Sequence, residues 1–309
     1  MVSRRQFVKQ VSLGALAGSG ISAAGAHLAA AVPTDDAEKS AAPRLIPGCC
    51  AYSYNEELRH GAMTLEDFIL KAIDLRVLAV DITAYYLKST ERGYLHGLRK
   101  LAYKHGIAFS GAACGVSMVQ AGAASRAESL KQIKKWVDVT DDLGASHLRI
   151  FAGKLPSGSS LKDAVDWVVE TMKAACDYSG EKGIMLGLED HDGVTQSADP
   201  CLEIMQRINS PFAGINLDIT NFIATPTQDS YAQIAACLPY ATNTHIRDHF
   251  PDGTPVDMER VWQMFAHAGH QGYMSAEYES GLPDRLPAAA GVPKLVHQIR
   301  ELCGKYSTV

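Results

Sequence analysis

Short apolar runs alternate along the chain with longer segments in which hydrophobic residues recur at helical spacing. The apolar runs predict strands near residues 45–52, 77–82, 107–113, 147–152, 184–189, 213–218, 241–246 and 272–277. The segments that follow them predict helices near 63–74, 90–105, 125–143, 160–181, 198–208, 228–237, 256–268 and 288–304. Eight strands, each followed by a helix, predict an α/β fold with one domain, a (β/α)8 TIM barrel.

Residue choice at several element ends agrees with this division. Thr64-Leu65-Glu66-Asp67 is typical of a helix start, since the Thr and the acid three residues later can cap each other. Cationic residues followed by glycine in Lys104-His105-Gly106 and Glu181-Lys182-Gly183 are typical of helix ends.

Four polar residues stand at the downstream ends of the last four predicted strands: Glu189, Asp218, His245 and Glu277. They are separated by roughly 30 residues, the length of one strand-plus-helix unit. A single carboxylate or His after a strand is usually a helix cap or a solvated loop residue. In a parallel barrel, however, all strands end on the same face, so four such residues in register predict one shared cavity that could hold a divalent metal.

The first residues carry a different pattern. Ser3-Arg4-Arg5-Gln6-Phe7-Val8-Lys9 precedes an apolar, Ala- and Gly-rich stretch, as in a twin-arginine export signal. We expect a signal over 1–31 with cleavage near Ala31, a linker over 32–43 and the barrel over 44–309. The twin-arginine export machinery would then be a partner, and the location periplasmic or secreted. The competing hypothesis, a stable membrane anchor, is disfavoured because the apolar stretch is short and interrupted by glycine.

Charge and cysteine content narrow the partners. When Arg4, Arg5 and Lys9 are left out with the expected signal, 26 of the 29 basic residues remain, against 34 acidic ones. This acidic balance argues against a nucleic acid partner, because phosphate backbones are bound by basic surfaces. Seven cysteines, an odd number without paired spacing, predict buried hydrophobic side chains and no disulfide framework.

Three carboxylates and one imidazole form a hard, oxygen-rich ligand set. It favours Mn²⁺ or Mg²⁺, with Zn²⁺ or Co²⁺ as alternatives. Such an ion can stabilise the enediolate that forms when a sugar loses a proton beside its carbonyl group. Glu189 and Glu277 are the candidate bases.

Several segments resemble the sugar phosphate isomerase/epimerase group of the xylose-isomerase-like barrel superfamily. They are Leu188-Glu189-Asp190-His191, Leu217-Asp218-Ile219-Thr220-Asn221, His245-Ile246-Arg247-Asp248, Gly253-Thr254-Pro255-Val256-Asp257 and Gly272-Tyr273-Met274-Ser275-Ala276-Glu277. The resemblance spans most of the chain but is specific only from residue 147 onward. It implies that Glu189, Asp218, His245 and Glu277 bind one divalent metal. It also implies that the two glutamates exchange protons with substrate on opposite faces, and that His191 and Arg247 contact substrate oxygens.

Other assignments near the site keep more than one interpretation each. Asn221 could contact substrate, cap the next segment or orient Asp218. Arg149 could reach substrate or serve as a structural ion-pair partner, and Arg247 could simply pair with Asp248 or another carboxylate. His191 could be an ordinary exposed loop residue. Further side chains that could line the mouth of the barrel are Tyr52, Tyr54 and Tyr85.

The sequence departs from the endonuclease branch of this superfamily. A phosphodiester-cleaving endonuclease would need a His three residues after the Asp, where this chain has Asn221, and its Asp-Arg-His triplet is absent. DNA repair is therefore disfavoured.

Three functions follow from these patterns. The first is a metal-dependent sugar or keto-sugar isomerase or epimerase that acts through an enediolate by Glu acid/base catalysis. The second is a periplasmic 3-keto-glycoside lyase or hydrolase, in which the same proton removal is followed by loss of the substituent at C1. The third is a non-catalytic periplasmic sugar-binding or metal-storage protein. All but metal storage expect a small carbohydrate as partner, and the sequence leaves open whether the chain forms a homo-oligomer.

Overall fold

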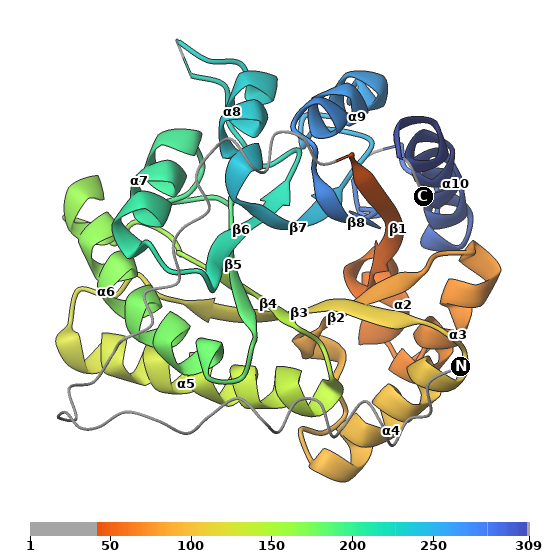
Figure 1. Cartoon of the computed structure of the whole chain (residues 1–309), viewed down its shortest axis with the longest axis horizontal. Coiled ribbons are helices and arrows are strands. Elements are labelled where there is room, and N and C mark those ends of the chain that lie inside the picture. Colours follow the sequence, from red (N-terminus) through yellow and green to blue (C-terminus); the bar gives the residue numbers. More distant parts are fainter. Residues whose placement is uncertain (1–41, 226, 283, 308–309) are drawn as a thin grey trace, which may run out of the picture. The chain divides into compact units, whose positions relative to one another are not determined.

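Eight parallel strands close into a barrel in the order in which they occur along the chain (Figure 1). The structure, a computed structural model, describes residues 42–225, 227–282 and 284–307. The strands are β1 (Arg44–Cys50), β2 (Ala79–Thr83), β3 (Ala108–Ser117), β4 (His147–Phe151), β5 (Met185–Glu189), β6 (Ala213–Asp218), β7 (Ala241–Ile246) and β8 (Gln271–Ala276). Pairing between β1 and β8 closes the ring. The predicted TIM barrel is confirmed.

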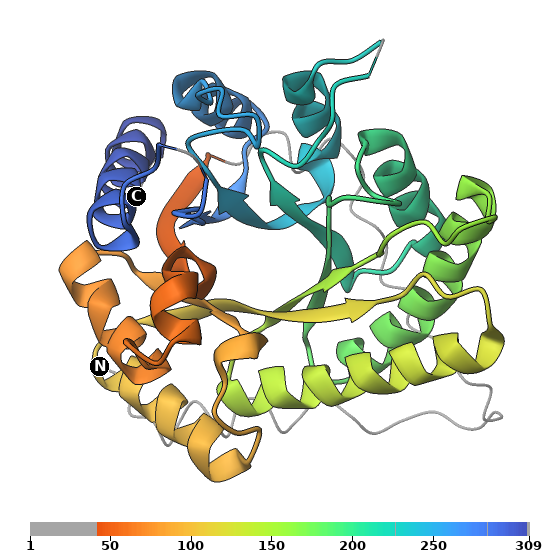
Figure 2. The ribbon, with the colours of Figure 1, turned by 180° about the vertical axis from the view of Figure 1, so that it is seen from behind.

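Helices alternate with the strands and surround them in both views down the barrel (Figures 1 and 2). The long helices are α3 (Leu65–Leu75), α4 (Arg92–Lys104), α5 (Ala123–Leu143), α6 (Leu161–Gly180), α7 (Ala198–Ile208), α8 (Ser230–Cys237), α9 (Met258–His267) and α10 (Ala288–Tyr306). All sixteen predicted elements are present, with ends shifted by a few residues. Four short helices were not predicted: η2 (Ala51–Tyr54), α2 (Asn55–Arg59), η3 (Ala84–Tyr86) and η4 (Leu238–Tyr240).

The predicted caps form as expected. The Asp67 backbone N–H donates to Thr64 Oγ1 at 3.1 Å, and the Thr64 N–H donates to Asp67 Oδ2 at 3.0 Å, so α3 begins with a reciprocal capping box. Gly106 and Gly183 follow helix ends with φ of +70° and +69°, a left-handed conformation that glycine adopts without strain.

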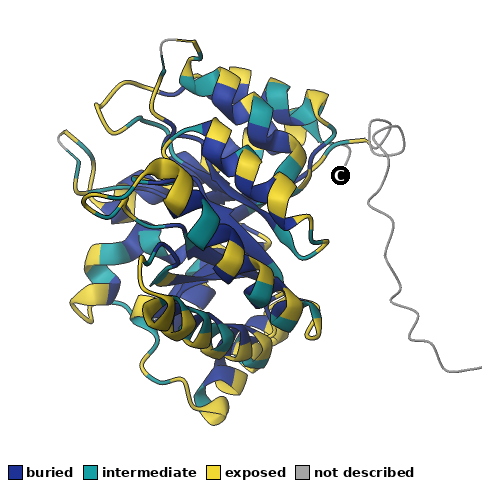
Figure 3. Cartoon of the chain, turned by 90° about the vertical axis from the view of Figure 1, so that its left-hand side faces the viewer, coloured by how far each residue is buried: buried dark blue, intermediate teal, exposed yellow. Residues whose placement is uncertain are grey.

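An apolar layer lies between the strands and the helices. It includes Ile82, Leu148, Trp262 and Phe265, all almost fully buried. In Figure 3 the strands are mostly buried, and the helices carry their exposed residues on the outer side. All seven cysteines are buried and free, as predicted.

The interior of the barrel is unusually polar. Asn243 on β7 donates a hydrogen bond to Asp81 on β2 at 3.2 Å, and because β2 and β7 are not neighbours this bond must cross the barrel interior. His147 also lies inside and leaves no room opposite it: a Cβ on Gly187 would sit 2.3 Å from His147 Nε2. These buried polar groups form the layer on which the candidate site rests.

The predicted signal (1–31) and most of the predicted linker (32–43) lie outside the described residues. Within the described part of the chain, no helix is both long and apolar enough to cross a membrane.

Candidate metal centre

The four strand-end residues predicted as ligands lie together at the carboxyl end of the barrel. One donor atom from each of Glu189, Asp218, His245 and Glu277 lies within 4.8 Å of the others. Glu189 and Asp218 end β5 and β6, His245 is the penultimate residue of β7, and Glu277 directly follows β8. Pairing of Asp218 with His245 in the sheet register brings these two strand ends level. All four side chains are buried.

His245 lies between the two glutamates. Its Nδ1 is 2.8 Å from Glu189 Oε1 and 2.6 Å from Glu277 Oε2. Burial would lower the pKa of His245, but Glu277, Cys50 and Glu189 together outweigh burial and raise that pKa well above the usual 6.5. Burial would raise the pKa of Glu277, but the charges of His245 and Arg247 hold it far below its usual range. The protonated His245 ring is thus a cation placed between the carboxylates of Glu189 and Glu277.

Asp218 offers one oxygen to the cluster and has the other one fixed. The backbone N–H and the hydroxyl of Thr220 both donate to Asp218 Oδ1 at 2.8 Å. Asp218 Oδ2 is buried and forms an ion pair with Arg247, whose Nη2 lies 3.0 Å away. Burial raises the pKa of Asp218 to about 6, although the charge of Arg247 opposes this rise.

These observations test whether the residues suit a divalent ion. Asp218 Oδ2 and Glu277 Oε2 are both buried, and the groups next to them are cationic: Arg247 Nη2 at 3.0 Å and His245 Nδ1 at 2.6 Å. Buried acceptors of this kind are costly unless a cation or donor satisfies them. Three carboxylates with one imidazole are a suitable ligand set for Mn²⁺, Mg²⁺, Zn²⁺ or Co²⁺. The four side chains therefore fit a metal centre.

A chain of buried amides supports the centre from below. Asn216 Nδ2 donates to Glu189 Oε1 at 3.1 Å. Asn243 Nδ2 bridges Asn216 Oδ1 at 3.1 Å and Asp81 Oδ2 at 3.2 Å. The sequence analysis missed these three residues. Asn216 and Asn243 stand two positions before Asp218 and His245, so strand alternation could have placed them on the same inward face.

Asp190 supports Asp218 from the side. Its Oδ1 accepts a hydrogen bond from the Asp218 backbone N–H at 2.8 Å. Asn221 Nδ2 donates to the Asp190 backbone carbonyl at 2.9 Å, so this amide is engaged with the loop that follows β5. Its predicted contact with substrate stays a prediction.

The two arginines named from the sequence both pair with candidate ligands. Arg247 Nη2 lies 3.0 Å from Asp218 Oδ2 and 3.4 Å from Glu277 Oε1, while its Nη1 lies 3.2 Å from Glu279. Arg149 is buried, with Nε 3.6 Å from Glu189 Oε2. Together with protonated His245, the two guanidinium groups balance the three carboxylates.

His191, predicted to contact substrate, and the three tyrosines predicted at the mouth differ in their exposure. His191 lies at the rim, with its ring edge-on to Phe151 at 4.7 Å between centroids. Tyr85 is 56% exposed and Tyr52 is half-buried. Tyr54 was wrongly expected to line the mouth: it is 1% exposed and packs against Phe68 of α3, because η2 turns its side chain into the layer behind the strands.

Three solved structures illustrate the similarity of the fold. D-allulose 3-epimerase from Methylomonas sp. is 17% identical, with a TM-score of 0.65 over 86% of this chain and 99% of that one. D-psicose 3-epimerase from Clostridium cellulolyticum H10 is 11% identical, with a TM-score of 0.69 over 84% and 99%. IOLI protein, solved with a zinc atom, is 14% identical, with a TM-score of 0.66 over 86% and 100%.

Comparison with curated protein sequences finds no significant match. The family model described as "Xylose isomerase-like TIM barrel" matches residues 70–301, which include all four candidate ligands and most of the barrel. The chain therefore belongs to the xylose isomerase-like TIM barrel family.

Proposed function

We propose that the protein is a divalent-metal-dependent isomerase or epimerase of sugars or keto-sugars. The observation that carries this proposal is the position of two glutamates around one point. Glu189 Oε1 and Glu277 Oε2 approach the same nitrogen of His245 at 2.8 Å and 2.6 Å, although they come from opposite sides of the strand that bears it. Two carboxylates so placed can serve two sides of one bound substrate.

The metal would be held by Glu189, Asp218, His245 and Glu277. The ligand set favours Mn²⁺ or Mg²⁺, and Zn²⁺ or Co²⁺ also suit it. When bound, the ion would stabilise negative charge that develops on substrate oxygens. The zinc atom named for IOLI protein, at 14% identity, supports a cation in this type of barrel.

The reaction needs a base and an acid from the protein. One glutamate removes the proton from the carbon beside the substrate carbonyl, and the electrons of the broken C–H bond form the enediolate double bond. The other glutamate returns a proton. Delivery to the opposite face of the same carbon epimerises it. Delivery to the former carbonyl carbon moves the carbonyl group, provided that the hydroxyl proton of the first carbon also passes to the former carbonyl oxygen. Arg247 and His191 would contact substrate oxygens, and Arg149 would keep Glu189 ionised by its charge.

The structural relatives support a carbohydrate as substrate. Two of them are named as epimerases of D-allulose and D-psicose. Because their identity to this chain is only 17% and 11%, the proposal extends to the class of substrate and names no particular sugar.

Proton exchange with solvent tests the reaction directly. The metal-loaded protein, incubated in D₂O with a panel of ketoses and keto-sugars, should introduce deuterium at the carbon beside the carbonyl. The same incubation without metal is the control. Sugar binding without any exchange would instead support the non-catalytic sugar-binding protein.

A second candidate is favoured by the export pattern in Ser3–Lys9. A periplasmic enzyme meets oxidised glycosides more readily than phosphorylated central metabolites. On a 3-keto-glycoside, the same base would remove the C2 proton, and the enolate would expel the C1 substituent. Release of that substituent, followed by mass spectrometry, separates this lyase outcome from isomerisation.

A further inference from the structure

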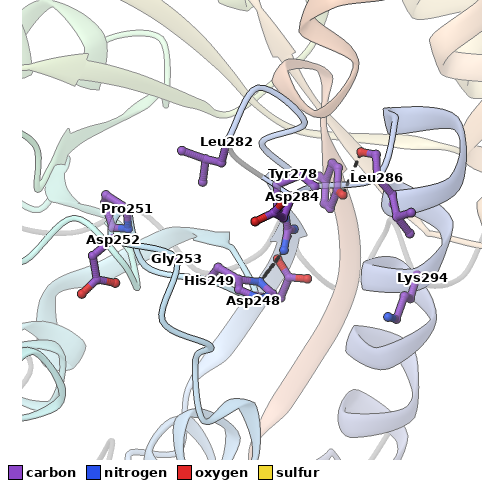
Figure 4. A pocket seen from close by; sticks show the side chains of 12 residues that line it. Asp248, His249, Pro251, Asp252, Gly253, Tyr278, Leu282, Asp284, Leu286 and Lys294 are labelled. Atoms are coloured by element: carbon purple, nitrogen blue, oxygen red, sulfur yellow. Dashed lines mark hydrogen bonds and ion pairs between the residues drawn. The ribbon is translucent and has the colours of Figure 1, made fainter.

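A cavity of about 560 Å³ lies beside the candidate metal centre, between the loops that follow β7 and β8 and the first turns of α10. Figure 4 shows Asp248, Tyr278 and Lys294 approaching it from these three segments. Arg247 and Glu277 belong to the metal centre, and the next residues, Asp248 and Tyr278, line the cavity. Because successive residues of an extended segment point to opposite sides, the centre and the cavity share the same two strand ends.

The cavity contains a buried cationic group with an unused donor. The Arg285 side chain is only 10% exposed, its guanidinium stacks on the Tyr278 ring at 4.4 Å from the centroid, and it pairs with Asp248. His249 contacts the same guanidinium. Arg285 Nε is nevertheless buried without a hydrogen-bond partner. Donors of this kind are usually satisfied in native structures by an ordered water or a ligand group.

The remaining lining combines charges with short apolar surfaces. Asp252, Asp284 and Lys294 border the cavity, and no ion pair joins Asp284 or Lys294 to any residue within the described ranges. Three carboxylates outnumber the two cations, and Arg285 is already paired, so a phosphate or carboxylate ligand is disfavoured. Leu282 and Leu286 add apolar wall. Donors, acceptors and apolar patches together suit a neutral ring that carries several hydroxyl groups.

A smaller cavity of about 210 Å³ adjoins the larger one on the side of Glu279. It shares Tyr278 and Leu282 with the larger cavity and is also lined by Glu279, whose carboxylate lies 3.2 Å from Arg247. A chain of lining residues therefore leads from Arg247 to Lys294.

We propose that the larger cavity binds a second sugar unit of a substrate whose first unit lies between Glu189 and Glu277. The substrate would then be a disaccharide or another sugar-substituted glycoside, and free monosaccharides would occupy only the inner position. The location of the first unit rests on the proposed function, whereas the second unit rests on the cavity.

The test compares mono- and disaccharides by calorimetric titration of the metal-loaded protein. Probes are D-fructose and 3-keto-glucose, each against disaccharides that contain it. We expect at least one matched disaccharide to bind about tenfold more tightly than its monosaccharide. In the double variant Lys294→Met/Asp252→Asn this advantage should disappear while the monosaccharide Kd stays unchanged. The matched control is Lys173→Met/Asp177→Asn on α6, far from the cavity in sequence and exposed.

Each outcome decides the proposal. Equal affinities in the wild-type protein, no disaccharide binding, or an advantage that persists in the cavity variant would each overturn it. Deuterium exchange separates this result from the proposed reaction. Exchange without a disaccharide advantage removes the second sugar site and keeps the reaction. A disaccharide advantage without exchange removes the reaction and keeps the site.

Discussion

Asn216 donates a hydrogen bond from its amide to Glu189 Oε1 at 3.1 Å, and Asn243 holds Asn216 in turn. The candidate base is thus oriented by a buried neighbour on the adjacent strand. We expect Asn216→Ala to weaken Mn²⁺ affinity about 10- to 100-fold, the usual effect of removing a residue that orients a metal ligand. Titration of metal-free protein measures this. Lys131→Ala, an exposed change on α5, is the control, and an unchanged Kd for Asn216→Ala would show that the amide does not position the centre.

The two glutamates should differ from other carboxylates in their effect on turnover. Glu189→Gln and Glu277→Gln keep the shape and one oxygen ligand but remove the base. We expect deuterium exchange to fall about 10²- to 10⁴-fold, the typical contribution of general base catalysis. Elemental analysis should still find bound metal when the ion is supplied in excess. Wild-type exchange in either variant would exclude that residue from proton transfer, and Glu181→Gln at the end of α6 serves as control.

Metal binding should release protons in a way that depends on pH. The pKa of His245 is raised well above 6.5, so at neutral pH one proton must leave this ring when the ion binds. The pKa of Asp218 is raised to about 6, so below that pH a second proton must leave as well. Affinity should therefore rise about tenfold per pH unit just above pH 6 and about a hundredfold per unit just below it.

Calorimetry in buffers with different ionisation enthalpies counts these protons. His245→Gln should lower the number of protons released by one at both pH 5 and pH 7. A count that does not change between pH 5 and pH 7 in the wild-type protein would contradict the predicted titration of Asp218.

Arg247 should compete with the metal while assisting the substrate. Its Nη2 lies 3.0 Å from Asp218 Oδ2, the oxygen that Asp218 would offer to the ion because Thr220 holds the other one. We expect Arg247→Met to leave metal affinity unchanged or higher, because a competing cation is gone, and to raise KM for the sugar about tenfold or more through loss of charged hydrogen bonds. Loss of metal binding in this variant would instead make Arg247 a structural support of the centre.

Export can be tested apart from catalysis. If residues 1–31 are a twin-arginine signal, changing Arg4 and Arg5 to Lys together should retain the protein in the cytoplasm. The barrel should still fold, since its described residues begin beyond that segment. Fractionation followed by immunoblotting gives the answer, and unchanged export of the double variant would remove the periplasmic assignment.

The sequence predicted the repeated features of this molecule better than the unique ones. Hydrophobic alternation identified every strand and long helix, because each buries one face against its neighbours. The four strand-end residues were found because the repeat length places them on one face. Their convergence is now a feature of the structure, while their roles stay predictions.

Contacts across the barrel could not be predicted in the same way. The hydrogen bond between Asp81 and Asn243 joins residues 162 positions apart, and the pairing of the strand that bears Asn243 shifts register between Ile215 and Asn216 of β6. Asp248 was considered as a partner of Arg247, but it pairs with Arg285 from a different loop. Such partners depend on loop paths, which local pattern does not specify.

The polar layer of Asp81, His147, Asn216 and Asn243 fills the barrel beneath the candidate centre, with Gly187 too close to His147 for even a methyl group. Within the described residues this layer closes the lower side of the centre, so we expect sugar to arrive and product to leave at the carboxyl ends of the strands. If both use that side, bound product should exclude incoming sugar, and the net rate in either direction should slow as product accumulates.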